Sequence, residues 1–465
     1  RALEPAVIAV EPSAREPIMK AVTDQKHAWF IRLWGVAALA HVVGNWHQPG
    51  VPTLLGGLLF LAGLLGASLV VRPARGRMLA LVVVIPISAA LEIPELGNHW
   101  LVAALASLAY LVTGGVWSRF EPTGRLVLIG FYSFAAFAKL NEGFFTPSTS
   151  CSTFYANQWL DGFGLGPLSG GEMALIVLTA AIELSVPILL LVPRTRFAGV
   201  LMATGFHTFI SWDLNQHFYD FTAVLVPLFA LFLSLTAFER LSSSAMIPRR
   251  ALGRGLAVVF GVSALAMLAA ATLPSFPATS FLLLTFPFFL WIPFSLWWLV
   301  AVLRYGRTAR VSAIGWRLTV AGAAVVAITI LNGLTPYLEL KTAFSFNMYS
   351  NLVTAQGKTN HFLVPATLPL RDGYDGPVEI VSSSDADLLY YPRYGYLVAW
   401  PQFRIYVADH PGIEVSYRRD GESFGYPGGD SELSQSVPWW WRWLPLRALD
   451  TQTPPRCQDV FLPAL

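Results

Sequence analysis

Long apolar runs separated by short polar stretches fill the first 335 residues of the chain. Most are about 17–24 residues long, the length that a helix needs to cross the hydrocarbon core of a bilayer. The pattern therefore predicts a polytopic α-helical membrane bundle of about eleven spans. The predicted spans lie near residues 28–45, 51–71, 78–93, 99–117, 126–143, 171–192, 197–212, 218–237, 255–273, 280–303 and 318–335.

The pattern changes on both sides of this bundle, which we place at residues 26–335. Residues 1–25 are polar and contain three prolines, and they predict a disordered cytoplasmic arm without a cleavable signal peptide. After Pro336, short runs rich in β-branched and aromatic residues alternate with Asp-Gly and Gly-Gly pairs. We expect residues 336–465 to form a small, mostly β domain. The predicted strands lie at 378–381, 396–400, 403–407 and 413–417.

Basic residues concentrate in every second loop between the predicted spans. These loops contain Arg72, Arg75 and Arg77; Arg119 and Arg125; Arg194 and Arg196; Arg249, Arg250 and Arg254; and Arg304, Arg307, Arg310 and Arg317. Because cytoplasmic loops carry an excess of Lys and Arg, the amino terminus is predicted to be cytoplasmic and residues 336–465 extracytoplasmic. We expect a multi-pass protein of a cell membrane. The compact form of the chain favours a bacterial inner membrane.

The composition supports this class. Charged residues make up 13% of the chain, against about 25% in soluble domains. The net charge is only +3 and gives no sign of a nucleic-acid partner. Two cysteines, Cys151 and Cys457, both fall on the predicted oxidising side. A disulfide between them and two free thiols are both open, because sequence carries no distances.

Ionisable and amide side chains collect towards the outer ends of the predicted spans. They are His41, Asn45, His47, Glu92, Glu95, Asn98, His99, Lys139, Asn141, Glu142, His207, Asp213, His217 and Asp220. Glu183 is an exception because it falls near the middle of a span. A charge there is costly, so we expect Glu183 to be neutral or paired.

Lys139 and His99 are the two candidates for catalysis. Lys139 shares a predicted helical face with Tyr132 and Glu142 and lies about one turn inside the span. Removing a lysine from water disfavours its charged form and can make a neutral amine available as a base. Snorkelling to the interface is the alternative interpretation of Lys139. His99 could donate a hydrogen bond to a developing oxyanion, or it could be structural.

Three stretches resemble the vitamin K-dependent γ-glutamyl carboxylase family and its bacterial relatives with an HTTM domain. The first is Gly97-Asn98-His99-Trp100, and the second is the segment 131–141, which ends in Lys139-Leu140-Asn141. The third is the segment 344–352, followed by Thr359-Asn360-His361. The resemblance covers most of the chain from about residue 28 onwards, although its specific motifs are short.

The resemblance implies a reaction and a site. Lys139 would deprotonate a reduced vitamin K hydroquinone, His99 would stabilise the oxyanion, and O2 would add to give the epoxide. In carboxylating relatives the reaction goes on to add CO2 to a protein or peptide glutamate. No metal is implied, and the histidines here are too scattered for a dense histidine cluster. The predicted quinone pocket comprises Asn98, Tyr132, Asn141, Glu142, His41 and His207.

Departures from the family pattern bear on which of these reactions occurs. Ala138 stands where the family has a second lysine, and Asn141 and Gly143 stand where animal members have acids. We therefore expect quinone epoxidation and leave carboxylation open. Two other classes also remain: a non-catalytic membrane component that binds quinone or lipid and presents the outer domain to a partner, and a transporter. Glu183 favours the transporter, and the lack of evident repeats disfavours it.

Overall fold

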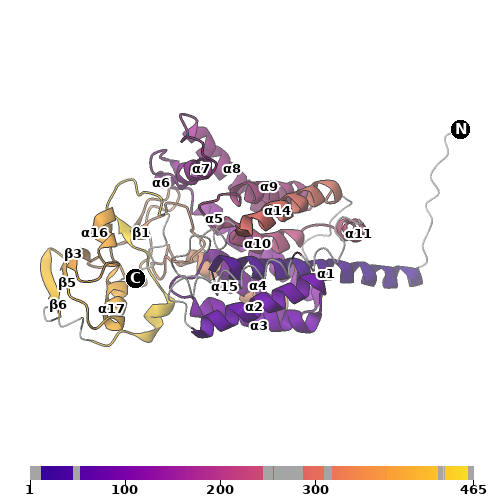
Figure 1. The fold of residues 1–465 in the computed structure, drawn as a ribbon, viewed down its shortest axis with the longest axis horizontal. Coiled ribbons are helices and arrows are strands. Elements are labelled where there is room, and N and C mark those ends of the chain that lie inside the picture. The colour runs from indigo at the N-terminus through magenta and orange to yellow at the C-terminus, as the bar shows by residue number, and fades with distance from the viewer. Residues whose placement is uncertain are drawn as a thin grey trace.

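The computed structural model describes residues 12–45, 53–243, 255, 286–307, 317–371, 373–427, 433 and 435–458. Its helices form an elongated bundle with the C-terminal domain at one end (Figure 1). The bundle contains α1 (Pro12–Asn45), α2 (Thr53–Val71), α3 (Arg75–Leu91), α4 (Asn98–Val112), α5 (Trp117–Phe137), α6 (Glu142–Phe145), α7 (Cys151–Gly162), α8 (Glu172–Leu191), α9 (Arg196–Ile210), α10 (Phe218–Ala230), α11 (Leu235–Ser243), α14 (Phe286–Tyr305) and α15 (Val320–Leu334). Helix α1 already begins at Pro12, inside the stretch predicted to be a disordered arm.

The number of membrane spans differs from the prediction. Within the described residues, three helices are long and apolar enough to cross a membrane: Leu54–Val71 in α2, Glu172–Leu191 in α8 and Pro287–Tyr305 in α14. Helices α10 and α11 would add a fourth span only as a pair, and they are bent by 113° where the chain breaks between them. The prediction of an eleven-span bundle is therefore wrong. The three helices are consistent with association with a membrane.

Helix length explains most of the difference. Helices α4, α9 and α15 have 15 residues each, and α10 has 13. At about 1.5 Å per residue they are shorter than the ~30 Å hydrocarbon core. Helix α5 is long enough, but its first turns carry Arg119, Glu121 and Arg125. The predicted span 255–273 lies outside the described residues, apart from Gly255.

The break after α10 is held by charged side chains from α1 and α5. Lys26 Nζ donates to the carbonyl oxygens of Leu231 and Leu233, at 2.9 and 2.7 Å. Arg125 Nε donates to the same Leu231 oxygen at 2.9 Å. Glu121 accepts from both cations, which offsets the cost of burying their charges. These bonds satisfy carbonyls that the broken helix leaves free and fix α10 inside the bundle.

The C-terminal domain combines small sheets with helices. An antiparallel sheet contains β3 (Glu379–Ser383), β5 (Val415–Arg419) and β6 (Glu422–Tyr426) in the order β3-β5-β6. Two-stranded pairs join β1 (Thr354–Ala355) to β2 (Lys358–Thr359) and β4 (Tyr396–Leu397) to β7 (Leu449–Asp450). The helical elements are α16 (Tyr390–Tyr394), α17 (Trp400–Asp409) and a 3-10 helix at Trp439–Trp443.

One predicted strand of this domain is instead a helix. Residues 403–407 belong to α17, which has a proline in its first turn. Trp400, Phe403 and Val407 are buried, and their spacing of three and four residues places them on one helical face. β-Branched and aromatic residues favour a strand, and the sequence prediction followed that preference. In the structure the helical spacing directs all three side chains into the core of the C-terminal domain.

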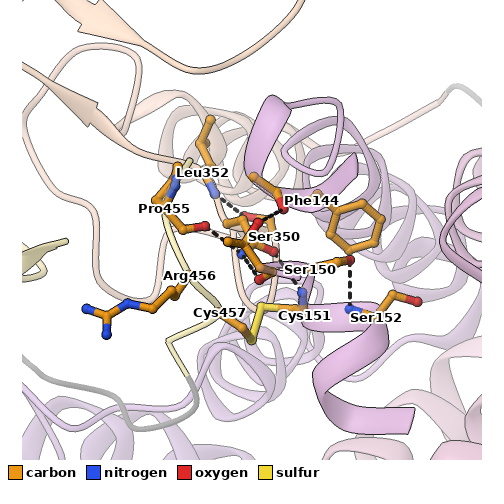
Figure 2. The surroundings of a disulfide bond; sticks show 12 residues. Phe144, Ser150, Cys151, Ser152, Ser350, Leu352, Pro455, Arg456 and Cys457 are labelled. Atoms are coloured by element: carbon orange, nitrogen blue, oxygen red, sulfur yellow. Dashed lines mark hydrogen bonds between the residues drawn. A yellow bond between two sulfur atoms is a disulfide. The ribbon is translucent and has the colours of Figure 1, made fainter. Parts of the chain in front are cut away.

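A disulfide and backbone hydrogen bonds attach the C-terminal tail to the bundle. Cys151, the first residue of α7, is bonded to Cys457 near the carboxyl end, as Figure 2 shows. Cys457 N also donates to Thr149 O, and Asn351 Nδ2 donates to Pro455 O. The disulfide that the sequence left open is thus formed, and it holds the C-terminal tail beside α7.

Candidate functional site

A cavity of about 150 Å³ lies where α5, α7, α8, α9 and α10 meet. Its walls are largely aromatic and aliphatic, with a few ionisable groups between them. The lining residues are Phe131, Tyr132, Ala135, Lys139, Phe144, Cys151, Ser152, Tyr155, Ala156, Trp159, Leu175, Thr179, Glu183, Phe206, His207, Phe209, Ile210, Asp213, Phe218, Phe221, Met348 and Tyr349. An apolar enclosure with a few convergent polar groups is typical of small-molecule sites.

Lys139 enters this cavity just beyond the end of α5. Its Nζ lies 2.7 Å from Glu183 Oε2 on α8, and the two side chains are only 8% and 13% exposed. Nζ is also 3.3 Å from the Ala135 carbonyl, to which it donates. Each charge offsets the desolvation of the other. The sequence predicted that Glu183 would be neutral or paired, and the structure pairs it with Lys139.

Tyr132 and His207 form the second polar pair in the cavity wall. The Tyr132 hydroxyl and His207 Nε2 are 3.1 Å apart. Both side chains are buried, and His207 Nδ1 has no hydrogen-bond partner in the described part of the chain. This pair offers one further donor or acceptor to a ligand.

Asp213 supplies a carboxyl group at the edge of the same cavity. It follows α9, and its Oδ1 accepts a hydrogen bond from Asn215 N at 2.9 Å. Burial raises the pKa of Asp213 to about 6, while its backbone hydrogen bonds act in the opposite direction. A group titrating there can hold a proton near neutral pH.

His99 is not among the residues that line this cavity. Its Nε2 lies 2.8 Å from Asp220 Oδ2, and its ring packs edge-on against Phe221, which does line the cavity. His41, also predicted for the pocket, does not line the cavity either. Its Nδ1 lies 3.0 Å from the same Asp220 oxygen, so His41, His99 and Asp220 form a separate cluster. Lys139 and His99, which the resemblance implies act on the same substrate, therefore do not line one cavity. The side chain of His99 instead contacts the buried carboxyl group of Asp220.

The remaining predicted pocket residues do not line the cavity, and two of them, Asn98 and Asn141, make hydrogen bonds to the backbone. Asn98 Oδ1 accepts from Phe346 N at 2.7 Å. Asn141 caps α6 by accepting from Phe144 N and donates to Ala138 O. Glu142 is exposed on α6. Of the predicted residues, the structure therefore brings Lys139, Tyr132 and His207 together with Cys151.

Sequence reasoning missed several parts of the site. Glu183 carried a signal, since it is an acid inside an otherwise apolar run, but nothing local identified Lys139 as its partner. The aromatic wall from α7, including Tyr155 and Trp159, lies between two predicted spans, where the hydropathy pattern predicts a loop. Met348 and Tyr349 belong to the segment 344–352, whose family resemblance does not by itself indicate a role in a cavity.

Comparison with protein-family models, with curated proteins and with solved structures gave no match to this chain.

Proposed function

We propose that this chain is a membrane-associated enzyme that converts a hydroquinone of the vitamin K type to its epoxide with O2. The observation that carries the proposal is the Lys139–Glu183 ion pair inside an apolar, aromatic cavity. The three short stretches that resemble the vitamin K-dependent carboxylase family support the same reaction.

The cavity suits an aromatic ring that arrives from lipid. A cavity of about 150 Å³ holds a single benzene-sized ring, so the reacting ring fits and the rest of a larger ligand has to extend outwards. Helix α8, one of the candidate spans, contributes Leu175, Thr179 and Glu183 to the lining. It exposes Val177, Leu178 and Ile188. A lipid-soluble ligand could therefore approach along α8.

The ion pair supplies the proton chemistry. Proton transfer within the pair gives a neutral amine and a carboxylic acid, so the pair can present either group as a base. It accepts the proton of a bound hydroquinone hydroxyl, and the ammonium of Lys139 then lies beside the oxyanion. Tyr132 and His207 orient the ring by hydrogen bonding. The hydroquinone and O2 supply the remaining chemistry, with epoxide and water as products.

We place the C-terminal domain on the oxidising, extracytoplasmic side and the amino terminus in the cytoplasm. The Cys151–Cys457 disulfide supports the first placement, since such bonds persist in oxidising compartments. The second placement rests on the sequence prediction alone, because the three candidate spans divide the basic loops differently from the eleven predicted ones. Carboxylation of a peptide glutamate with CO2 stays secondary, because Ala138 and Asn141 depart from the family pattern.

The test is epoxide formation by purified protein given reduced vitamin K and O2. We expect epoxide from the wild type, and at least about a 100-fold lower rate from Lys139→Met, the scale of general acid–base catalysis. Glu183→Gln should also lower the rate. Lys358→Met, at an exposed lysine of β2, is the matched control and should keep full activity.

Three results discriminate among the classes. Folded wild type that binds the hydroquinone but forms no epoxide would reject the enzyme in favour of a non-catalytic quinone-binding component. Equal epoxide from Lys139→Met would remove Lys139 from the reaction. Labelled bicarbonate with a glutamate peptide separates a carboxylase from an epoxidase.

A further inference from the structure

A second cluster of ionisable side chains lies apart from the cavity lining, where α1, α4 and α10 meet near the carboxyl end of α3. His41 of α1, His99 of α4 and Asp220 of α10 each place one nitrogen or oxygen atom within 4.8 Å of the other two. His41 Nδ1 and His99 Nε2 lie 3.0 and 2.8 Å from Asp220 Oδ2. The proposed epoxidation chemistry does not use these groups.

The His41 nitrogen that points away from Asp220, Nε2, has the surroundings expected for a histidine that binds a metal through its other nitrogen. It lies 3.0 Å from Glu92 Oε1, at the carboxyl end of α3. Trp100 stacks on the ring with centroids 3.6 Å apart. A histidine that binds a metal through one nitrogen usually donates the other N–H to a carboxylate, which fixes the tautomer and the ring orientation. Glu92 is placed to do this, with Nδ1 then directed at Asp220.

Charge and one buried carboxylate oxygen leave room for a cation. In that tautomer, the lone pair of His41 Nδ1 accepts from Asn45 Nδ2 at 3.1 Å, and the same amide nitrogen donates to Asp220 Oδ2 at 2.8 Å. A bound cation would take the place of this amide between the two ligand atoms. Asp220 Oδ1 is buried and has no hydrogen-bond partner within the described residues. A metal binds imidazoles in their neutral form, so a divalent ion at this position would lie beside the two carboxyl groups of Asp220 and Glu92 without a competing positive charge on His41 or His99.

We propose that His41, His99 and Asp220 bind a divalent first-row transition metal ion. The ligand atoms are His41 Nδ1, His99 Nε2 and the carboxylate of Asp220, with Glu92 as the outer carboxylate that orients His41. Two imidazoles and one carboxylate suit zinc, iron and similar ions, and leave further coordination positions for water. This proposal differs from the sequence prediction, which implied no metal.

The residue spacing explains why the sequence did not reveal the site. His41 and Asp220 are 179 positions apart, and His99 and Asp220 are 121 positions apart. No short motif contains two of the ligands. They meet only because α1, α4 and α10 pack against one another, as the contacts α1–α10 and α4–α10 show.

The test uses the full chain purified in detergent without chelators. Metal analysis of the wild type should find close to one equivalent of a transition metal. After chelation, Co2+ titration should give a visible absorption band that saturates near one equivalent and is displaced by Zn2+. His99→Gln and Asp220→Asn should abolish the band. Glu92→Gln should weaken Co2+ binding by roughly 10–100-fold, the usual effect of losing an outer carboxylate.

His410→Gln is the matched control, because His410 lies on the C-terminal domain and bonds to the Tyr406 carbonyl. It should bind Co2+ as the wild type does. Circular dichroism and thermal unfolding show whether each variant is folded. A folded wild type without metal and without a Co2+ band would overturn the proposal and make the cluster a hydrogen-bonded imidazolium. Unchanged Co2+ binding by folded His99→Gln and Asp220→Asn would overturn it as well.

Discussion

Glu183 lies in the apolar middle of α8, and its Oε2 is 2.7 Å from Lys139 Nζ. Each residue alone had an ordinary explanation: Lys139 could snorkel, and Glu183 could be neutral. Their contact changes the interpretation of both residues, because each is the partner that offsets the cost of burying the other. Their location in the cavity lining makes the same contact available to a ligand.

Removing one member of this pair should destabilise the fold. In Lys139→Met the Glu183 carboxylate loses its partner, and we expect a loss of about 3 kcal/mol, as for other broken buried pairs. The double variant Lys139→Met/Glu183→Gln removes both charges and should recover much of that loss. Denaturant unfolding of the wild type, both single variants and the double variant measures the coupling. Additive effects would show that the pair contributes no interaction energy.

Asp213 should give the protein a pH-dependent stability. Burial raises its pKa to about 6, so the folded state binds this proton more tightly than the unfolded state, where the value is 3.8. The contribution is therefore fully present below about pH 4 and is lost as the pH rises through about 6. The Tm of the wild type relative to Asp213→Asn should fall over this interval and then level off. A difference that does not change between pH 4 and 7 would contradict the assignment.

At the scale of elements, hydropathy identified where apolar helices occur but overestimated how many could cross a membrane. Helix α10 shows the reason. The apolar run 218–237 is continuous in sequence, yet the helix ends at Ala230. Lys26 and Arg125 bind the carbonyls beyond that point. A sequence window cannot detect a break that is stabilised by side chains from distant helices.

Helices α1 and α2 approach closely at a pair of glycines, and this contact can be tested. A Cβ atom on Gly35 would lie 2.6 Å from the Gly66 carbonyl oxygen, and one on Gly66 would lie 2.7 Å from the Gly35 carbonyl oxygen. Gly35→Ala or Gly66→Ala should therefore force the helices apart and cost about 1–3 kcal/mol. Thermal unfolding in detergent would measure the loss.

Gly57 provides the control on the same helix α2. Nothing lies within 4 Å of a Cβ built there. Gly57→Ala should be neutral or should stabilise by up to about 1 kcal/mol, because alanine favours the helix. If Gly35→Ala and Gly57→Ala had the same effect, the close approach of α1 and α2 would not limit stability.

At the scale of the whole molecule, the disulfide joins parts that are 306 positions apart. The C-terminal domain has its own core around Val378, Phe403 and Tyr417. The chain then returns to the bundle, where Cys457 packs with Phe144 and Ile176 beside α7 and α8. Cys151 also lines the cavity, so the tail is held next to the candidate site.

Loss of this disulfide should lower stability by about 2–4 kcal/mol, because the unfolded chain gains freedom. Cys151→Ser, Cys457→Ser and the double variant should all show the same loss, since each removes one and the same bond. Unfolding of the wild type with and without reductant provides the comparison. Wild-type stability that is unaffected by complete reduction would show that the bond does not constrain the fold.

The sequence by itself determined the apolar, helix-rich bundle, the change of pattern near residue 336, and Lys139 and Glu183 as unusual charges in apolar surroundings. These features depend on composition and on neighbours within a few turns. Tertiary structure alone decided which helices are long enough to span, that Lys139 pairs with Glu183, and that His99 turns to Asp220. Those outcomes depend on contacts between distant segments, and packing selects such contacts by shape and charge that no local pattern contains.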